Sequence, residues 1–398
     1  MTAAGGLPAG VIRRAPEDFV VEEIPAYSSS GRGEHVIVTF RKTGRTTPDA
    51  VRALAFALGA DPRAAGFAGM KDRHAVTTQA ASFQVPIAVD PAPLLAAAEI
   101  PGVEILDDAR HDNKLKPGHL AGNRFRITVR DVDPAELAGA RAVLEEAGRA
   151  GVPNAFGPQR FGRDGRNPAR ALAWIEGRER GPRDKREQRL LFSALQSLWF
   201  NEVLAARELD GTWKTVLPGD VAKRHDSGGL FAVPLDGPEL EDARARAEAL
   251  AVSATGPMFG KKMRWPEGAP GALELDVLTR TIGDPHRLDA FAHLGEGTRR
   301  PLRLEVKDLE VKELEGRDLA ASPGDNGGAI QVSFVLPKGG YATTLLGRAF
   351  RLVDASARSG ERDPAPGPGP QPEAEPEPEP EEEGAADAPS PLDPSPSR

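Results

Sequence analysis

The chain has 398 residues, of which 39% are hydrophobic, 28% are charged and none is cysteine. The missing cysteines exclude a disulfide scaffold, thiolate zinc sites, iron–sulfur ligation and cysteine nucleophiles. With 51 basic and 59 acidic side chains the formal net charge is −8, which at first argues against a polyanionic partner. The length is sufficient for two or three domains with sizeable cores.

The negative charge is concentrated at the C-terminal end. Residues 361–398 contain eleven acidic and two basic residues, and 12 of the 37 prolines. Glutamates repel one another and proline denies the backbone regular pairing, so we predict that residues 355–398 form a disordered acidic tail. Residues 1–360 then carry a net charge of only +1, and nucleic acid is again a possible partner.

No targeting segment is recognisable in the sequence. The first eleven residues lack a cationic start, and no window approaches the ~20 apolar residues that a membrane helix needs. We therefore expect a soluble, cytoplasmic protein.

The first third of the chain mixes predicted strands and helices. Phe125, Ile127 and Val129 occupy every second position, which is typical of a half-buried strand. Val51, Leu54 and their neighbours recur at helical spacing and stop at a glycine. The expected strands are 19–23, 35–40, 83–87 and 125–129, and the expected helices are 51–58 and 134–148.

The middle of the chain has a different pattern, because strand signals give way to an Arg- and Gly-rich stretch and then to helical periodicity. Strand signals return near the end. Strand-rich ends around a helix-rich centre predict an α+β protein with an inserted domain, the alternative being one large α+β domain. The expected helices are 190–209, 239–252 and 284–294, and the expected strands are 302–306 and 330–336.

Motifs for several common chemistries are missing. No histidine pair has zincin spacing, no G-x-S-x-G elbow is present, and no G-x-G-x-x-G opens a helix after a strand. Gly66–Asp72 is not a phosphate loop, because Asp72 stands where Ser or Thr would hold magnesium. The remaining candidates are Asp, Glu, Lys, Arg and Tyr side chains acting without a cofactor.

The densest group of such residues is the segment Phe67–Gln79, with Asp72 at its centre. In one interpretation this is a surface turn in which Asp72 caps a helix or pairs with a cation. In the other, Asp72 is an ionised nucleophile presented on a loop, a role that carboxylates take toward a sugar anomeric carbon. The composition of the segment does not separate the two.

The segment resembles the signature of the TruD family of tRNA pseudouridine synthases: a small residue, Gly, any residue, Lys-Asp-Arg/Lys, His-Ala-Val-Thr, any residue, Gln. The resemblance extends over residues 8–353. The other matching blocks follow in the family's order and are 16–23, 31–35, 122–125, 151–162 and 334–343.

The resemblance implies that the chain isomerises uridine to pseudouridine in tRNA, at uridine 13 and mainly in glutamate tRNA, without a cofactor or metal. Asp72 would be the nucleophile, and Phe19, Asn123 and Tyr341 would line the uridine pocket. Arg13 falls where the family places a basic residue, usually lysine, near the aspartate. From spacing alone, Phe19 is equally a core residue, Asn123 a turn former and Tyr341 a strand-end aromatic.

The resemblance also implies a domain arrangement. Residues 1–153 and 305–354 would form the pseudouridine synthase core, an antiparallel mixed sheet flanked by helices. Residues 154–304 would form an inserted α/β domain, the TRUD domain, that closes a cleft over tRNA. We expect a monomer.

Two rival functions remain open. An Asp-dependent nucleosidase or glycosylase would need a second carboxylate or a water path, and a non-catalytic RNA-binding protein would use its aspartate structurally. Within the isomerase reading, attack at C1′ and abstraction of a sugar proton are both compatible with the sequence.

The basic residues of the body are bunched, which would suit a directional RNA-binding face. Each group alone is equally a solvated surface. The four groups are Arg110, Lys114, Lys116, Arg124 and Arg126; Arg160, Arg163, Arg166 and Arg170; Arg178, Arg180, Arg183, Lys185, Arg186 and Arg189; and Lys261, Lys262 and Arg264.

Deletion of residues 361–398 is expected to tighten tRNA binding or make it less selective, because the eleven acidic side chains compete with phosphate for the basic face. Titration of tRNA against both forms of the chain at several salt concentrations measures this effect. Equal affinity at low salt would contradict it.

Overall fold

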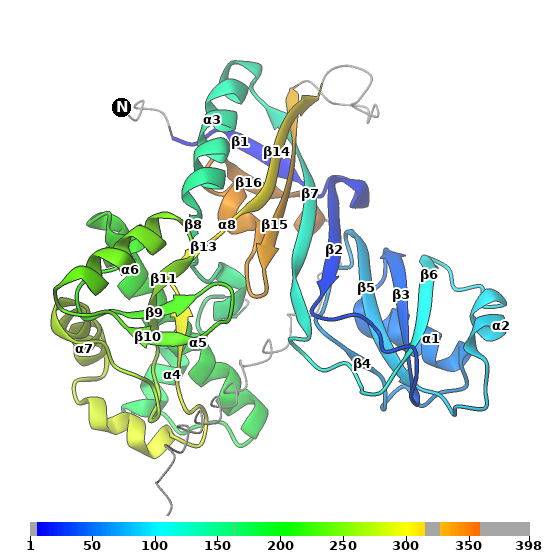
Figure 1. Cartoon of the computed structure of the whole chain (residues 1–398), viewed down its shortest axis with the longest axis horizontal. Coiled ribbons are helices and arrows are strands. Elements are labelled where there is room, and N and C mark those ends of the chain that lie inside the picture. The colour runs from blue at the N-terminus through cyan, green and yellow to red at the C-terminus, as the bar shows by residue number, and fades with distance from the viewer. Residues whose placement is uncertain (1–5, 163, 315–326, 359–398) are drawn as a thin grey trace, which may run out of the picture.

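The computed structural model describes residues 6–162, 164–314 and 327–358, and a mixed sheet of ten described strands is its main feature (Figure 1). The order along the sheet is β14-β15-β7-β2-β5-β3-β6, with β1, β4 and β16 attached beside this path. Pairing is antiparallel except for β2 with β5 and β1 with β16. The α+β class expected from the sequence is confirmed. The strands are β1 (Ala9–Ile12), β2 (Phe19–Pro25), β3 (His35–Thr43), β4 (Gly66–Phe67), β5 (Val76–Gln84), β6 (Val103–His111), β7 (Leu120–Val132), β14 (Lys307–Leu314), β15 (Gly328–Pro337) and β16 (Arg351–Asp354).

The apolar faces of the central strands bury the first core. Alternate residues of β7 and β15 point to the same side, and the rings of Phe125 and Phe334 stack with centroids 5.2 Å apart. Helices α3 (Pro134–Ala150) and α8 (Ala342–Leu346) add leucines and alanines to this core. Burial of each large side chain contributes about 2 kcal/mol, so the strand alternation holds the sheet against these helices.

A second core covers β3 and β5. Helix α1 (Thr47–Ala57) begins where the Thr46 hydroxyl accepts a hydrogen bond from the Asp49 amide, and Leu54 on its buried face packs into this core. Helix α2 (Pro91–Ala96) adds Leu95. This part of the sheet carries the segment around Asp72.

Residues 154–304 form a separate arrangement of helices around a small sheet, at the lower left of Figure 1. Strand β11 is buried along its whole length, and apolar clusters lie on both of its sides. Although α5 has 25 residues, no helix among the described residues is long and apolar enough to cross a membrane. The strand order is β10-β9-β11-β12, and the elements are α4 (Asn167–Ile175), α5 (Lys185–Leu209), β9 (Val221–Arg224), β10 (Leu230–Ala232), α6 (Pro238–Glu248), β11 (Val252–Met258), α7 (Gly268–Ile282) and β12 (Thr298–Pro301).

The chain leaves the large sheet and returns to it at one point. Strands β8 (Val152–Pro153) and β13 (Arg303–Leu304) pair there with each other. Arg303 donates hydrogen bonds to the carbonyls of Ala150, Lys214 and Ala247, and so ties α3 to the inserted segment. This geometry is what an insertion of residues 154–304 requires, and the domain boundaries stay a prediction.

Several local expectations differ from the structure. The helix expected at 284–294 is a 3-10 helix, η4 (Pro285–Phe291), and Ile87 lies beyond the end of β5 and is exposed, because Pro86 cannot donate to the ladder. The resemblance implied an α/β inserted domain, but the sequence pattern placed neither helix α7 nor the strands of its small sheet. The predicted tail lies outside the described residues from 359 onward, and residues 355–358, expected as its start, form a 3-10 turn.

Glu274→Gln is expected to lower the free energy of unfolding by about 3–5 kcal/mol, because it leaves a buried cation without its counter-charge. Glu274 on α7 and Arg299 on β12 form two hydrogen bonds of 2.7 Å, and their side chains are 2% and 1% exposed. Urea unfolding measures the change.

The matched control is Asp276→Asn on the same helix. Asp276 pairs with Arg280 at the surface, so its loss should change stability by ~0.5 kcal/mol or less. Equal effects of the two substitutions would contradict the assignment of the buried pair as a stabilising tie.

Candidate active site

Asp72 lies in the loop between β4 and β5, and three hydrogen bonds fix the backbone of this loop. The amide of Lys71 donates to the Thr47 hydroxyl at 2.9 Å, and the Arg73 side chain donates to the Gly44 carbonyl at 3.1 Å. The ammonium of buried Lys42 donates to the carbonyl of Asp72 itself at 2.7 Å. The backbone is therefore anchored to β3 and the start of α1, while the Asp72 side chain remains 48% exposed.

The carboxylate of Asp72 is paired with Arg13. Arg13 follows β1 directly and has a φ of 56°, a left-handed conformation that turns its side chain away from the strand direction. Its Nη2 donates to Asp72 at 2.5 Å and its Nη1 donates to Asp354 at 2.6 Å. The guanidinium also lies 4.0 Å from the centroid of the Phe19 ring. One cation is thus held by two carboxylates and an aromatic face.

Sheet register explains why these residues meet. Strands β1 and β16 run parallel, and Ile12 stands opposite Asp354. Strand β2 begins at Phe19, and Val20 stands opposite Val76 at the start of β5. The ends of β1 and β16 and the starts of β2 and β5 thereby converge beside the loop that carries Asp72.

A second ion pair lies on the other side of the loop. Lys71 contacts Glu23 of β2 at 2.6 Å, with the two side chains only 7% and 5% exposed. Glu23 stands opposite Asn123 of β7, and among the described residues the buried Oδ1 atom of Asn123 has no hydrogen-bond partner. A buried acceptor without a donor costs free energy, so a donor that the described residues do not supply would stabilise this atom.

Tyr341 belongs to a different group of residues. It follows the turn after β15 and packs against the apolar core of the inserted segment. Among the described residues, no hydrogen bond, ion pair or ring contact joins it to Asp72. The structure therefore brings Arg13, Phe19 and Asp72 into contact, relates Asn123 to them through Glu23 and Lys71, and places Tyr341 with the inserted segment.

Sequence reasoning missed three residues of this site: Asp354, Lys42 and Glu23. Asp354 is 341 positions away from Arg13 along the chain, and only strand pairing reveals the contact. Lys42 lies in a strand at a position where a lysine is expected to point into solvent. Glu23 lay inside a matched block, but no pattern indicated that it would pair with Lys71.

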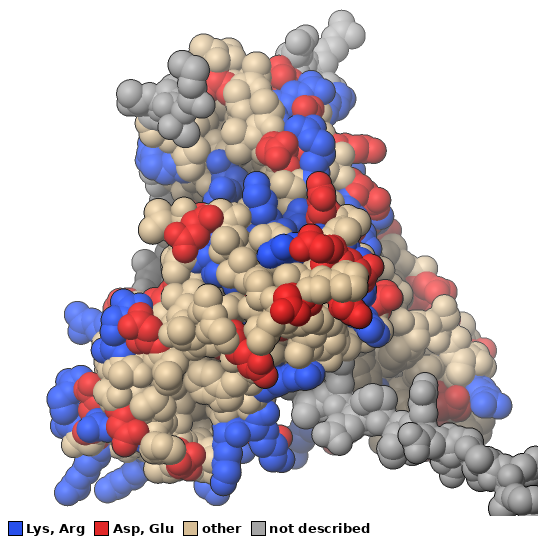
Figure 2. Space-filling model, turned by 60° about the vertical axis from the view of Figure 1, so that its left-hand side comes forward, with Lys and Arg blue, Asp and Glu red and all other residues tan. Residues whose placement is uncertain are grey.

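The surface of the molecule is charged but mixed. In the face shown in Figure 2, Lys and Arg alternate with Asp and Glu, and basic groups gather along the lower margin. Several members of the predicted basic groups are paired: Arg124 with Asp308, Arg170 with Glu187, and Lys262 with Glu296. These pairs reduce the number of cations available to a polyanion.

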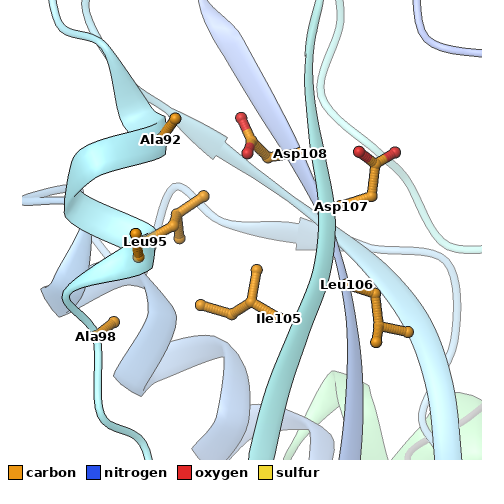
Figure 3. A pocket seen from close by; sticks show the side chains of 8 residues that line it. Ala92, Leu95, Ala98, Ile105, Leu106, Asp107 and Asp108 are labelled. Atoms are coloured by element: carbon orange, nitrogen blue, oxygen red, sulfur yellow. The ribbon is translucent and has the colours of Figure 1, made fainter.

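The cavity of about 440 Å³ between α2 and β6 lies apart from Asp72 (Figure 3). Leu95, Ile105 and two carboxylates line it, and burial together with Asp107 raises the pKa of Asp108. An acidic lining of this kind repels phosphate. Among the described residues, no group of three or more His, Asp or Glu side chains could hold a metal ion.

Comparison with known proteins gives consistent matches over most of the chain. The family model described as tRNA pseudouridine synthase D (TruD) matches residues 2–168 and 184–349. The tRNA pseudouridine synthase D of an Anaeromyxobacter species is 44% identical over 365 residues, which cover 89% of this chain and 95% of the relative. That of Thermus thermophilus is 41% identical over 339 residues, covering 85% and 87%.

A solved structure has the same fold. The crystal structure of the putative tRNA pseudouridine synthase D from Methanosarcina mazei superposes with a TM-score of 0.70 at 23% identity. The match covers 88% of this chain and 95% of that one.

Proposed function

The chain belongs to the TruD family of tRNA pseudouridine synthases, and we propose that it converts uridine to pseudouridine in tRNA with Asp72 as the nucleophile and without a cofactor. The resemblance seen in the sequence motifs is confirmed by the family match. The observation that carries the assignment of Asp72 is its ion pair with Arg13 on a side chain that remains half exposed. The carboxylate faces a fixed cation and is open to a substrate.

The reaction is an isomerisation in which nothing is oxidised or reduced. The N1–C1′ bond of uridine breaks, the uracil turns, and a C5–C1′ bond forms. C5 then loses its proton, and N1 ends with one. One carboxylate suffices for the sugar, by attacking C1′ or by abstracting a sugar proton.

Arg13 gives Asp72 its orientation. Because its guanidinium also contacts Asp354 and lies over Phe19, it cannot follow a freely rotating Asp72 side chain. The carboxylate is therefore preorganised, and the rate benefits from an avoided loss of conformational freedom. The guanidinium of Arg13 lies over the Phe19 ring, and this contact helps to hold it in place.

Asn123 and Tyr341 are proposed to hold the base. Asn123 is half-buried, and its side-chain amide offers both a donor and an acceptor, which suits a polar edge of uracil. The Tyr341 ring would offer an aromatic face while the detached uracil turns. The target base must leave its stack at a cost of a few kcal/mol, which contacts with the RNA backbone must offset.

The proposed target is uridine 13, mainly in glutamate tRNA. The resemblance to the family supports this choice, and mapping of the product within the tRNA tests it. The two rival functions differ in product: a glycosylase releases free uracil, and an RNA-binding protein without catalysis gives a complex and no product.

Asp72→Asn is expected to abolish pseudouridine formation, by at least ~10³-fold, because the amide cannot act as a nucleophile or base. Its shape and its contact with Arg13 are retained, so tRNA affinity should stay within about twofold. The assay follows pseudouridine in unmodified tRNA, with wild-type chain in EDTA as the test of cofactor independence. Product formation by the variant at the wild-type rate would sink the mechanism.

Asp354→Asn is expected to lower kcat about tenfold, which corresponds to about 1.4 kcal/mol, with little change in KM. The weaker contact at Nη1 lets the Arg13 guanidinium reorient and releases Asp72. Steady-state kinetics on tRNA measures the split.

Asp308→Asn is the matched control, because Asp308 pairs with Arg124 at the surface. It should leave both parameters unchanged. An unchanged kcat in Asp354→Asn would show that Arg13 does not need its second carboxylate.

A further inference from the structure

Two arginines of the inserted segment flank a single aromatic ring. Arg160 lies on the 3-10 helix η2 (Pro158–Phe161) and Arg300 on β12. Their guanidinium carbons are 5.4 and 4.0 Å from the centroid of Phe156. Both side chains are half-buried, so each keeps some access to solvent.

The hydrogen-bond partners of these two arginines are neutral. Arg160 donates to the hydroxyls of Ser193 and Ser197 on α5. Arg300 donates to the carbonyl and side-chain oxygens of Asn154 and, at 3.2 Å, to the carbonyl of Gly339. Within residues 6–162, 164–314 and 327–358, no carboxylate lies within ion-pair distance of either.

Among the described residues, three of the four fully buried arginines have a carboxylate each, and the fourth, Arg303, is held by three backbone carbonyls. Arg130 pairs with Asp18, Arg207 with Asp220 and Arg299 with Glu274. Burial of a charge is costly unless a counter-charge accompanies it. Arg160 and Arg300 lack that compensation among the described residues.

The electrostatics of the two groups agree with the geometry. Burial lowers the pKa of Arg300 to about 10, and the neighbouring Arg160 acts in the same direction. Burial also lowers the pKa of Arg160. Arginine is protonated at neutral pH, so two like charges share one aromatic ring, and an anion bound beside them would relieve their repulsion.

Each guanidinium also has free donors. In the described part of the chain, the Nη1 atoms of Arg160 and Arg300 make no hydrogen bond, and neither is among the atoms sealed from solvent without a partner. A guanidinium matches a phosphate through two parallel N–H···O bonds.

The position of the pair relates it to the proposed uridine pocket. Gly339, which accepts from Arg300, is two residues before Tyr341, and Tyr341 packs against the apolar cluster that contains Phe156. Leu336 of the same hairpin stands opposite Asn123. An anion held here would lie beside the turn that carries Tyr341.

We propose that Arg160 and Arg300 form a binding site for a backbone phosphate of the RNA, next to the nucleotide whose base enters the pocket. The inference rests on the proposed function in that the ligand is tRNA. Its energetic role is to offset the cost of extruding the base, with the phosphate clamped on the inserted segment and the sugar presented to Asp72.

The test uses the full chain carrying Asp72→Asn, so that tRNA binds without turnover. Arg160→Gln and Arg300→Gln are compared with this parent over a range of KCl concentrations. We expect each to raise the Kd for unmodified tRNA about tenfold at ~0.1 M KCl and to reduce the slope of log K against log [KCl] by about one. A variant with the parent's thermal unfolding midpoint, affinity and slope overturns the proposal.

Arg170→Gln is the matched control. Arg170 lies in the same segment, but its charge is already neutralised by Glu187. Its slope should equal that of the parent, and an equal loss there would show that any charge change in this segment weakens binding. Arg160→Lys serves if the glutamine variants do not fold. It keeps the charge without the paired donors, so we expect the parent's slope with a Kd raised less than about tenfold.

Inorganic phosphate separates a free anion from RNA as the occupant. If phosphate raises the unfolding midpoint of the parent but not of Arg160→Gln, while both have the same salt slope for tRNA, the site serves free phosphate and the proposal is wrong. Pseudouridine formation is also assayed with Arg160→Gln and Arg300→Gln in the chain that keeps Asp72. This assay separates the phosphate-site hypothesis from the proposed function. If the arginine variants show the reduced salt slope but the wild-type chain forms no pseudouridine, the proposed reaction is refuted and the phosphate site is still supported.

Discussion

The parallel pairing of β1 with β16 is the constraint on which the site depends. It joins residues near the two ends of the described chain and places Asp354 beside Arg13. The ion pair between Arg13 and Asp72 is exposed enough that it contributes little to stability, about 0–1 kcal/mol. Its value lies in geometry, because the second carboxylate and the Phe19 ring fix a cation that would otherwise be mobile. The backbone of Arg13 adopts the strained left-handed conformation, and this conformation directs its side chain toward the two carboxylates.

The fold was predictable where local pattern and tertiary role coincide. The alternation in Phe125–Val129 and in 330–336 gave strands, since one face of each is buried against α3 and α8. Helix α5 was found for the same reason, although its start at Lys185 depends on the cap formed by Asp184 rather than on periodicity. The small sheet was missed because β9 and β10 are only four and three residues long, and β11 contains glycine and proline.

The candidate site was only partly predictable, for a different physical reason. The loop around Asp72 was conspicuous because it is poor core material, and Arg13 and Phe19 came from the resemblance to the family. Asp354 and Lys42 are ordinary charges in their local sequence, and they become part of the site through pairing of strands far apart in the chain. Likewise, nothing local distinguishes Arg160 and Arg300 from the other arginines of the middle segment. What sets them apart is that both are partly buried against the Phe156 ring with no described carboxylate beside either, which is a property of the packed structure.

The residues proposed for catalysis are divided between two cores, and this division bears on how substrate would be held. Arg13, Phe19 and Asp72 are fixed by the large sheet, whereas Tyr341 packs on the inserted segment together with Phe156, Arg160 and Arg300. The hairpin formed by β15 and the turn after it belongs to the sheet at Leu336 and meets Arg300 at Gly339. A phosphate bound by the two arginines would therefore act on the same turn that positions the aromatic face. RNA binding and the placement of Tyr341 would then be coupled through one backbone carbonyl, since Gly339 accepts from a guanidinium whose other donors would hold the RNA. Two like charges beside one another are costly in the folded chain alone. Their retention is explained when the substrate supplies their counter-charge.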